Sequence, residues 1–253
     1  GLIQSAVIAM ANPGENILMP RNVHISVIKI CTMQNINPIF FDLEYSTETG
    51  HYKPITKIWL ENIFEKLNFN ENKIAGVILV SPSYHGYAGD LEPLIDCCHQ
   101  KNLPVLVDEA HGSYFLFCEN LNLPKPALTS NADLVVNSLH KSLNGLTQTA
   151  VLWYKGRLIN EGNLIKSINL LQTTSPSSLL LSSCEESIKD WLNKKSLSKY
   201  QKRILNAKSI YEKLIQKNIP LIETQDPLKI VLNTSKVGID GFTADRFFYR
   251  NGL

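Results

Sequence analysis

The chain has 253 residues, of which 44% are hydrophobic, and its formal net charge is only +2. This length is sufficient for one large hydrophobic core, or for one large and one small domain. Lysine and arginine are scattered along the sequence, which argues against a nucleic-acid-binding surface, and no apolar stretch approaches the length of a membrane span.

The cysteines and the chain ends give two further expectations. None of the five cysteines belongs to a Cys-x-x-Cys motif, so we predict buried, reduced thiols in a cytoplasmic protein rather than a zinc site. They are Cys31, Cys97, Cys98, Cys118 and Cys184. The sequence starts without Met or a basic lead and stops in mid-pattern. It is therefore interpreted as a fragment cut at both ends, without a signal peptide.

Helical and strand-like patterns alternate through the first half of the chain. Helices are expected at residues 1–11, 22–34, 59–67 and 90–99, the second capped by Asn22 and the fourth by Asp90. Short apolar strands are expected at residues 16–20, 38–41, 74–80 and 104–108. This alternation is typical of an α/β fold with a doubly wound, mainly parallel sheet and right-handed crossovers.

The pattern changes after Lys141. One further strand is expected at 147–153, followed by helix from Arg157 to about Lys217 with a break near Ser175-Pro176. A strand at 228–232 and a helix from Thr243 resemble the opening of a second unit. We therefore predict a major domain over residues 1–195, and a linking helix with the start of a smaller α/β domain over 196–253.

Two apolar, β-branched runs each lead to an ionisable residue. Asp108 ends the run Val105-Leu106-Val107, and Lys141 follows the run that begins at Leu134. Both runs are typical of buried parallel strands, whose carboxyl ends face the ligand site in open α/β sheets. A lysine and a carboxylate brought together there are what a pyridoxal 5'-phosphate enzyme requires, since the amine binds the aldehyde and the acid keeps the ring nitrogen protonated.

Several motifs, in order along the chain, resemble the signatures of the Orn/Lys/Arg decarboxylases. They are Pro20–Ser26, Ser81–Gly86, Val107–Gly112, Ser138–Lys141, Thr147–Thr149 and Gln172–Ser177. These decarboxylases are pyridoxal phosphate enzymes of fold type I, similar in architecture to aspartate aminotransferase. The resemblance implies a sheet of the seven-stranded type, decarboxylation of a basic amino acid, and a place in amino acid and polyamine metabolism.

The resemblance also implies catalytic roles for three residues. Lys141 would be the Schiff-base lysine and Asp108 the partner of the pyridinium nitrogen. His111, three residues past Asp108, would face the phenolic oxygen of the ring or the substrate carboxylate. Lys141, or a nearby histidine, would return a proton to the substrate Cα.

Four more residues are implied to bind the cofactor. His24 would lie against the face of the ring, and Ser138 and His140 would lie near the phosphate. The Ser138 hydroxyl, three residues before Lys141, can reach that phosphate. Ser83 occupies a position that the family usually fills with Thr, so its contact is less secure. His24 could instead be a capping or packing residue, and His140 would be structural if the strand continued through it.

Other histidines and acids have simpler explanations. Glu109 is expected to support its neighbours or to form an ion pair rather than to act as the catalytic acid. His51, His85 and His99 belong to no polar constellation recognisable in the sequence, and no role is assigned to them.

The resemblance also predicts what lies around the site. The family carries a Gly- and Thr-containing phosphate loop just before the position of Gly1, and it completes its small domain beyond the position of Leu253. It forms homodimers or higher homo-oligomers with the active site at the interface. The stretch Thr173–Ser177 would belong to that contact.

Three alternative functions remain open from the sequence. Asp108-Glu109-Ala110-His111 also occurs in helicases, but the phosphate-binding motif that those enzymes need upstream is not present in this sequence. An aminotransferase or aldol-type lyase could use the same fold, and so could a protein that binds the cofactor without turnover. The choice between lysine, ornithine and arginine as substrate also stays open.

Overall fold

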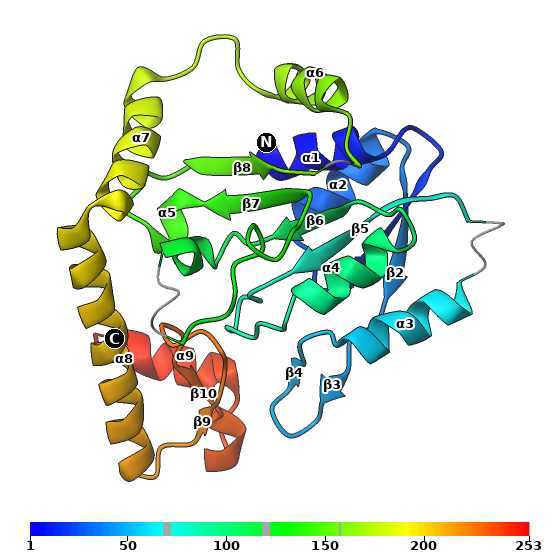
Figure 1. Cartoon of the computed structure of the whole chain (residues 1–253). Helices are drawn as coiled ribbons and strands as arrows, with labels where there is room; N and C mark the ends of the chain where they lie inside the picture. The colour runs from blue at the N-terminus through cyan, green and yellow to red at the C-terminus, as the bar shows by residue number, and fades with distance from the viewer. Residues whose placement is uncertain (68–71, 118–121, 157, 253) are drawn as a thin grey trace.

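The computed structural model describes residues 1–67, 72–117, 122–156 and 158–252. A six-stranded sheet forms its centre, with helices on both faces (Figure 1). Its strands are β1 (Asn16–Pro20), β2 (Asn37–Phe41), β5 (Ile74–Val80), β6 (Val105–Asp108), β7 (Leu134–Ser138) and β8 (Ala150–Tyr154). They lie in the order β2-β1-β5-β6-β7-β8, and every neighbouring pair is parallel except β7 and β8. The predicted α/β class and mainly parallel sheet are confirmed. The resemblance implied a sheet of the seven-stranded type, and the described residues form six strands of the central sheet.

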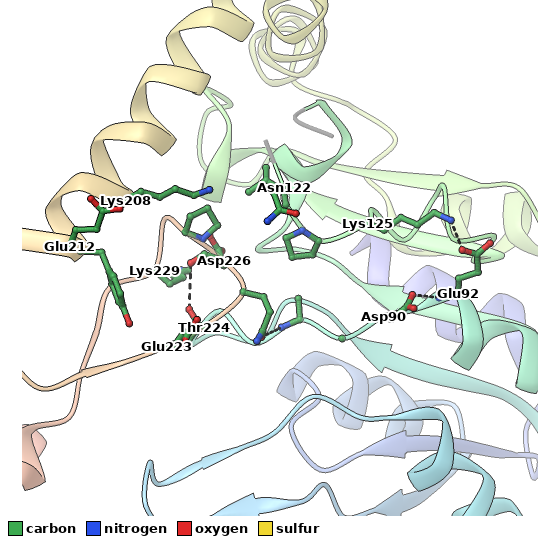
Figure 2. A pocket seen from close by; sticks show the side chains of 17 residues that line it. Asp90, Glu92, Asn122, Lys125, Lys208, Glu212, Glu223, Thr224, Asp226 and Lys229 are labelled. Carbon is green, nitrogen blue, oxygen red and sulfur yellow. Dashed lines mark hydrogen bonds and ion pairs between the residues drawn. The ribbon is translucent and has the colours of Figure 1, made fainter. Parts of the chain in front are cut away.

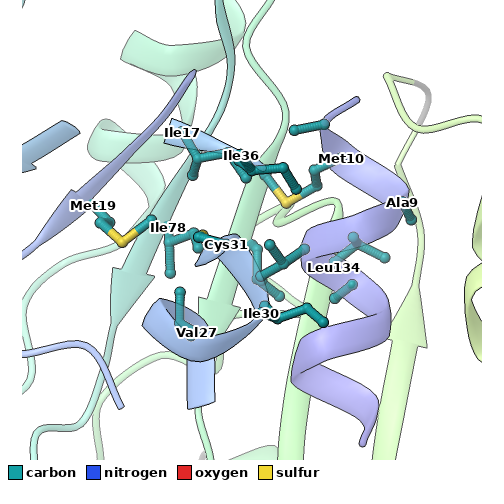
Figure 3. Packing of buried hydrophobic residues seen from close by; sticks show 14 of the residues in the cluster. Ala9, Met10, Ile17, Met19, Val27, Ile30, Cys31, Ile36, Ile78 and Leu134 are labelled. Carbon is teal, nitrogen blue, oxygen red and sulfur yellow. The ribbon is translucent and has the colours of Figure 1, made fainter. Parts of the chain in front are cut away.

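Alternate side chains of the sheet enter two separate hydrophobic clusters. Ile78, Leu106 and Leu134 pack toward one face, in the cluster drawn in Figure 3. Val77 and Val107 pack toward the other. Because successive side chains of a strand point to opposite faces and both faces are covered, these strands are apolar throughout rather than alternating.

The helices cover the two faces unequally. One face carries α1 (Leu2–Met10), α2 (Ile25–Met33) and α6 (Glu161–Leu171), and the other carries α3 (Lys57–Lys66) and α4 (Glu92–His99). Helix α1 contacts α2, α6 and several strands, which explains why it is apolar on most sides.

Two predicted helix caps are wrong by one or two residues. Helix α2 is capped by His24, not Asn22, because the backbone becomes helical only at Ile25 and the His24 ring accepts the Ser26 N–H. The N-cap of α4 is Leu91, and Asp90 accepts the Glu92 N–H from one position further upstream.

The remaining elements are α5 (Leu139–Ser142), η1 (Ser113–Phe117), α7 (Ser178–Leu192), α8 (Lys194–Gln216), β9 (Leu221–Ile222), β10 (Val231–Leu232), η3 (Thr234–Val237) and α9 (Gly241–Arg250). Of these, α5 and η1 lie at the carboxyl edge of the sheet, and α7 and the elements after it extend the chain away from the sheet. The predicted break near Ser175-Pro176 lies between α6 and α7. The predicted strand at 228–232 is reduced to two residues, because the Leu228 N–H bonds the Asp226 carboxylate instead of a strand. Helix α9 begins two residues before Thr243, since Asp240 accepts the Thr243 N–H.

A hairpin of β3 (Tyr45–Ser46) and β4 (His51–Tyr52) was not expected from the sequence. It touches the C-terminal segment, where Asn233 Nδ2 donates to the Glu48 carbonyl at 3.2 Å and Lys236 pairs with the Glu48 carboxylate at 3.1 Å. Each strand is only two residues long, which is too short for an alternating pattern to be visible.

The predicted burial is confirmed for three of the four thiols that the structure describes. Cys31, Cys97 and Cys98 are free and buried, while Cys184 is free but only half-buried, so the expectation of burial is wrong there. Cys118 lies outside the described residues. Of the helices within the described ranges, none has both the length and the apolar character that crossing a bilayer requires.

Candidate active site

A cavity of about 460 Å³ opens at the edge of the sheet where β1, β6 and β7 end. The adjacent strands β6 and β7 are in register, with Asp108 opposite Val136, so their carboxyl ends meet at this edge. Six of the seven predicted site residues line the cavity: His24, Asp108, His111, Ser138, His140 and Lys141. The structure thus brings together side chains that are up to 117 positions apart in the sequence.

Lys141 reaches the cavity from a helical turn rather than from a strand. Strand β7 ends at Ser138, and the short helix α5 then carries Lys141. Its Nζ lies 3.2 Å from Nε2 of His111. Burial, and then the charge of Lys141, lowers the pKa of His111 to about 4. A neutral His111 ring can therefore accept a hydrogen bond from the Lys141 ammonium.

Asp108 presents a buried carboxylate to the same cavity. Its Oδ1 accepts the Ala110 N–H at 3.1 Å. Burial raises the pKa of Asp108, although this hydrogen bond and the charges of Lys141 and His24 act in the opposite direction. A cationic N–H donor in the cavity would stabilise the ionised form, because an opposite charge nearby lowers the pKa of a carboxyl group. The position suits a protonated ring nitrogen.

The cavity also has lining groups that suit a phosphate. Gly1, Leu2 and Ile3 at the N-terminus of α1 line it together with Ser138 and His140. The N-terminus of a helix favours anions through its free N–H groups and its dipole. His140 Nδ1 donates to the Thr149 carbonyl at 2.9 Å, which leaves Nε2 for a ligand. The sequence left open that His140 would be structural if the strand continued through it. Strand β7 ends at Ser138, so that condition is not met.

His24 and Ser83 differ in their placement. His24 caps α2 through Nδ1 and also lines the cavity, so the capping explanation and the proposed ligand contact are compatible. Ser83 lines a different, small cavity, and its Oγ accepts the Tyr87 N–H at 3.2 Å. The structure therefore does not bring Ser83 together with the other six residues, and its cofactor contact stays a prediction.

Glu109, next to Asp108, links the end of β6 to the neighbouring strand β7. It is almost completely buried; its carboxylate accepts the Ala127 N–H at 2.8 Å and the Asn137 amide at 3.1 Å. Asn137 in turn accepts the Trp153 indole N–H at 2.8 Å, which ties β6, β7 and β8 together. Burial raises the pKa of Glu109 to about 8. These hydrogen bonds favour the expected supporting role of Glu109.

A second cavity, of about 300 Å³, adjoins the first at His111 and Lys141. Sequence reasoning did not find the residues that close it: Tyr114, Tyr200, Arg203, Asp226 and Lys229. Most of them belong to α8 and to the loop after β9, far from the recognised motifs. The Asp226-Pro227 pair could have indicated a turn, but nothing in the sequence connects it to Lys141.

The three histidines left without a role have partners in the structure. His99 Nε2 lies 2.8 Å from the buried Asp133 carboxylate. Asp133 directly precedes β7, so this pair lies at the amino edge of the sheet, whereas the cavity opens at the carboxyl edge. The rings of His51 and His85 stack with centroids 3.9 Å apart, and Tyr84 contacts both His85 and His111 edge-on at 5.5 Å. The β3–β4 hairpin is therefore connected to the site through a chain of aromatic rings.

Comparisons with known proteins agree with this geometry. The sequence profile described as "Orn/Lys/Arg decarboxylase, major domain" matches residues 2–246. The arginine decarboxylase of Bacillus anthracis is 31% identical over 97% of this chain and 50% of its own length. That of Bacillus subtilis is 29% identical over 98% of this chain and 51% of its own length.

Solved structures show the same fold at low sequence identity. The constitutive lysine decarboxylase of E. coli superposes with a TM-score of 0.73 at 17% identity, covering 83% of this chain and 30% of that one. Cystalysin of Treponema denticola, which contains pyridoxal 5'-phosphate, gives a TM-score of 0.67 at 17% identity over 98% and 62%. The chain spans about half the length of the curated relatives it matches. Because the family profile covers nearly all of its residues, the chain belongs to the Orn/Lys/Arg decarboxylase family.

Proposed function

We propose that the protein decarboxylates a basic amino acid with pyridoxal 5'-phosphate as cofactor. The observation that carries the proposal is that Asp108, at the end of β6, and Lys141, on the helical turn after the neighbouring strand β7, line one cavity. The names of the curated relatives favour arginine over lysine or ornithine as the substrate. Since the chain spans only about half of those relatives, the activity of the whole protein is part of the proposal.

The cavity has a matching group for each part of the cofactor. Lys141 would bind the aldehyde carbon covalently, and Asp108 would accept a hydrogen bond from the ring nitrogen. His24 would pack against one face of the ring. The N-terminus of α1, Ser138 and His140 would hold the phosphate. When bound, the cofactor supplies a conjugated cation that takes up the electron pair released as CO₂ leaves.

The residues of the chain then orient the substrate and move protons. Asp108 would keep the ring nitrogen protonated, because a carboxylate next to that nitrogen favours its protonated form. Lys141 holds a proton close to the substrate Cα and delivers it after CO₂ has left. His111 accepts a hydrogen bond from Lys141 and so fixes the direction of the amine. The adjoining cavity of about 300 Å³ begins at the same two residues and offers room for the substrate side chain.

The proposal extends to organisation and location. We propose a homodimer in the cytoplasm, with a major domain over 1–195 and the start of a smaller domain from residue 196. The loop between α6 and α7, including Thr173–Ser177, is exposed and stands away from the sheet (Figure 1), as a subunit contact would need. The free thiols support a reducing compartment.

The test is to incubate the purified protein and pyridoxal 5'-phosphate with arginine, lysine or ornithine. The proposal predicts CO₂ and the corresponding amine from at least one of them. Lys141→Ala should abolish this product and the absorbance band of the lysine-bound cofactor, whereas Lys166→Ala, on the exposed side of α6, should change neither. A keto acid without CO₂ would indicate an aminotransferase, and a cofactor spectrum without product a binding protein; either result contradicts the proposal.

A further inference from the structure

Lys229 lies beside the candidate active site, on the loop that follows β9. It lines the cavity of about 300 Å³ together with Lys141 and His111. The same loop also borders a larger cavity, of about 790 Å³, in which Lys229 lies next to Asp226 (Figure 2). Neither the recognised motifs nor the proposed cofactor contacts include this lysine.

A series of contacts connects Lys229 to Lys141. The Lys229 ammonium lies over the Tyr84 ring, 5.4 Å from its centroid. The centroids of the Tyr84 and His111 rings are 5.5 Å apart in an edge-on contact, and His111 Nε2 lies 3.2 Å from Nζ of Lys141. Burial, and then the charges of Lys141 and Lys229, lower the pKa of His111. The two ammonium groups are therefore close neighbours of the same histidine.

The backbone around Lys229 positions its side chain. The Asp226 N–H bonds the Gly86 carbonyl at 3.0 Å, and the Lys229 N–H bonds the Asp226 carbonyl at 3.0 Å. Gly86 has a φ of +96°, and a Cβ at this position would lie 2.9 Å from Cβ and from Cγ of Lys229. The stem of the lysine therefore packs directly against the Gly86 backbone, which a larger residue would prevent. A side chain held in this way is preorganised for binding.

The carboxylate of Asp226 does not neutralise the Lys229 ammonium by direct contact. Its Oδ1 accepts hydrogen bonds from the Tyr114 hydroxyl and the Leu228 N–H. Its Oδ2 is buried and has no hydrogen-bond partner among the described residues. Lys229 is half-buried, and a partly buried charge is stabilised by an opposite charge that can approach it. An anion in the cavity that Lys229 shares with Lys141 would provide that charge.

The substrate carries one group of the required charge. An amino acid whose amine takes the place of Lys141 has its carboxylate on the adjoining Cα, whereas the charged end of a basic side chain is repelled by Lys229. We propose that Lys229 binds the α-carboxylate of the substrate through a charge-assisted hydrogen bond. This role rests on the proposed function, which places the substrate amine at Lys141. The cavity is larger than a carboxylate, so the substrate side chain can share it.

The test compares two ligands that differ only in this carboxylate. Borohydride reduction of pyridoxal 5'-phosphate with arginine, or with its decarboxylated amine agmatine, yields two stable conjugates. Each is titrated calorimetrically into the cofactor-free protein, and we expect the arginine conjugate to bind at least ten-fold more tightly. Lys229→Gln should weaken binding of the arginine conjugate at least ten-fold and should change binding of the agmatine conjugate less than two-fold.

Two further variants serve as controls for the loss of charge. Lys229→Arg keeps a cation at this position and should retain part of the preference for the arginine conjugate. Lys202→Gln removes a charge from the exposed surface of α8, outside the cavity, and should change neither affinity. If Lys229→Gln does not fold, as judged by circular dichroism, the two affinities of the unaltered protein decide alone.

The outcomes separate the role of Lys229 from the proposed function. Equal affinities of the two conjugates for the unaltered protein would overturn the role of Lys229 alone. So would equal weakening of both conjugates by Lys229→Gln, or loss of the preference in Lys202→Gln. Absence of saturable binding of either conjugate would contradict the proposed cofactor site, and the role of Lys229 with it.

Discussion

The parallel sheet and the segment after α8 differ in how they are held in place. Every side chain of β6 and β7 is buried, and both faces of these strands are packed. Beyond α8 the strands have two residues each, and α9 buries only Ala244 while Phe242 and Tyr249 are at least 80% exposed. The sheet therefore supplies a rigid edge for the candidate catalytic side chains.

The C-terminal segment reaches the site through the loop that carries Asp226, Leu228 and Lys229. The Asp226 N–H bonds the Gly86 carbonyl at 3.0 Å, and Gln225 accepts the Ala88 N–H at 3.0 Å. Tyr114 of η1 holds the Asp226 carboxylate. Among the described residues, hydrogen bonds join the two regions at this loop and at the β3–β4 hairpin, so each region can be tested with its own substitutions.

The largest effect is expected from Asp108 at the edge of the sheet. Asp108→Ala should lower turnover on the order of 10³-fold or more, because a buried, preorganised charge opposite the ring nitrogen is lost. Some cofactor should remain bound through Lys141 and the phosphate contacts. Steady-state rates measure the turnover, and cofactor spectra measure the bound cofactor. Asp96→Ala, on the exposed side of α4, is the control. Turnover within a few-fold of the unaltered protein would contradict the assignment.

A matched pair of isoleucines tests the difference in packing. Ile78 is completely buried in β5, whereas Ile239 near α9 is 40% exposed. Ile78→Ala should lower the free energy of unfolding by about 2–5 kcal/mol, because it leaves a cavity in the core. Ile239→Ala should cost less than about 1 kcal/mol, since much of its side chain is already in water. Urea unfolding measures both; equal losses would show that the two regions are equally packed.

Glu109 should make the stability of the sheet region dependent on pH. Its pKa rises from an ordinary value of 4.5 to about 8 in the folded chain, so the folded state holds a proton that the unfolded state releases. The contribution is fully present below pH 4.5 and is lost as the pH rises to about 8, by about 1.4 kcal/mol per unit of pKa difference. Urea unfolding at pH 5 and pH 8 should show a smaller decrease for Glu109→Gln than for the unaltered protein. An equal decrease in the free energy of unfolding for the variant and the unaltered protein would exclude Glu109 as the cause of the pH dependence.

Tyr114→Phe tests the contact between the two regions. It removes the hydroxyl that donates to Asp226 and leaves that buried carboxylate with one donor fewer. We expect the free energy of unfolding to fall by about 0.5–1.5 kcal/mol, the usual net contribution of one hydrogen bond, because the same oxygen keeps the hydrogen bond from the Leu228 N–H. Tyr52→Phe, in the exposed β3–β4 hairpin, is the matched control. Equal stability of the two variants would show that this contact does not hold the loop.

The sequence predicted the sheet because its signal is local and strong. The runs that became β5, β6 and β7 are apolar, short and bounded by turn residues, so their burial could be inferred directly. The position of Asp108 and Lys141 at one edge followed from parallel strands having their carboxyl ends on the same side.

Other features depend on contacts that a sequence does not display. His24 replaced Asn22 as the cap because the backbone becomes helical only at Ile25, and a ring nitrogen can accept the Ser26 N–H as an amide oxygen would. Ser83 lies in a familiar motif, but the loop turns its hydroxyl to the Tyr87 N–H. Asp226 is brought to the site by the tertiary path of α8, and no periodic pattern connects it to Lys141.

The central claim is that Lys141 carries the cofactor. The direct measurement is to incubate the protein with pyridoxal 5'-phosphate, reduce it with borohydride, digest it and locate the phosphopyridoxyl group by mass spectrometry. We expect one labelled lysine, Lys141. Labelling of a different lysine, or of none, would contradict it.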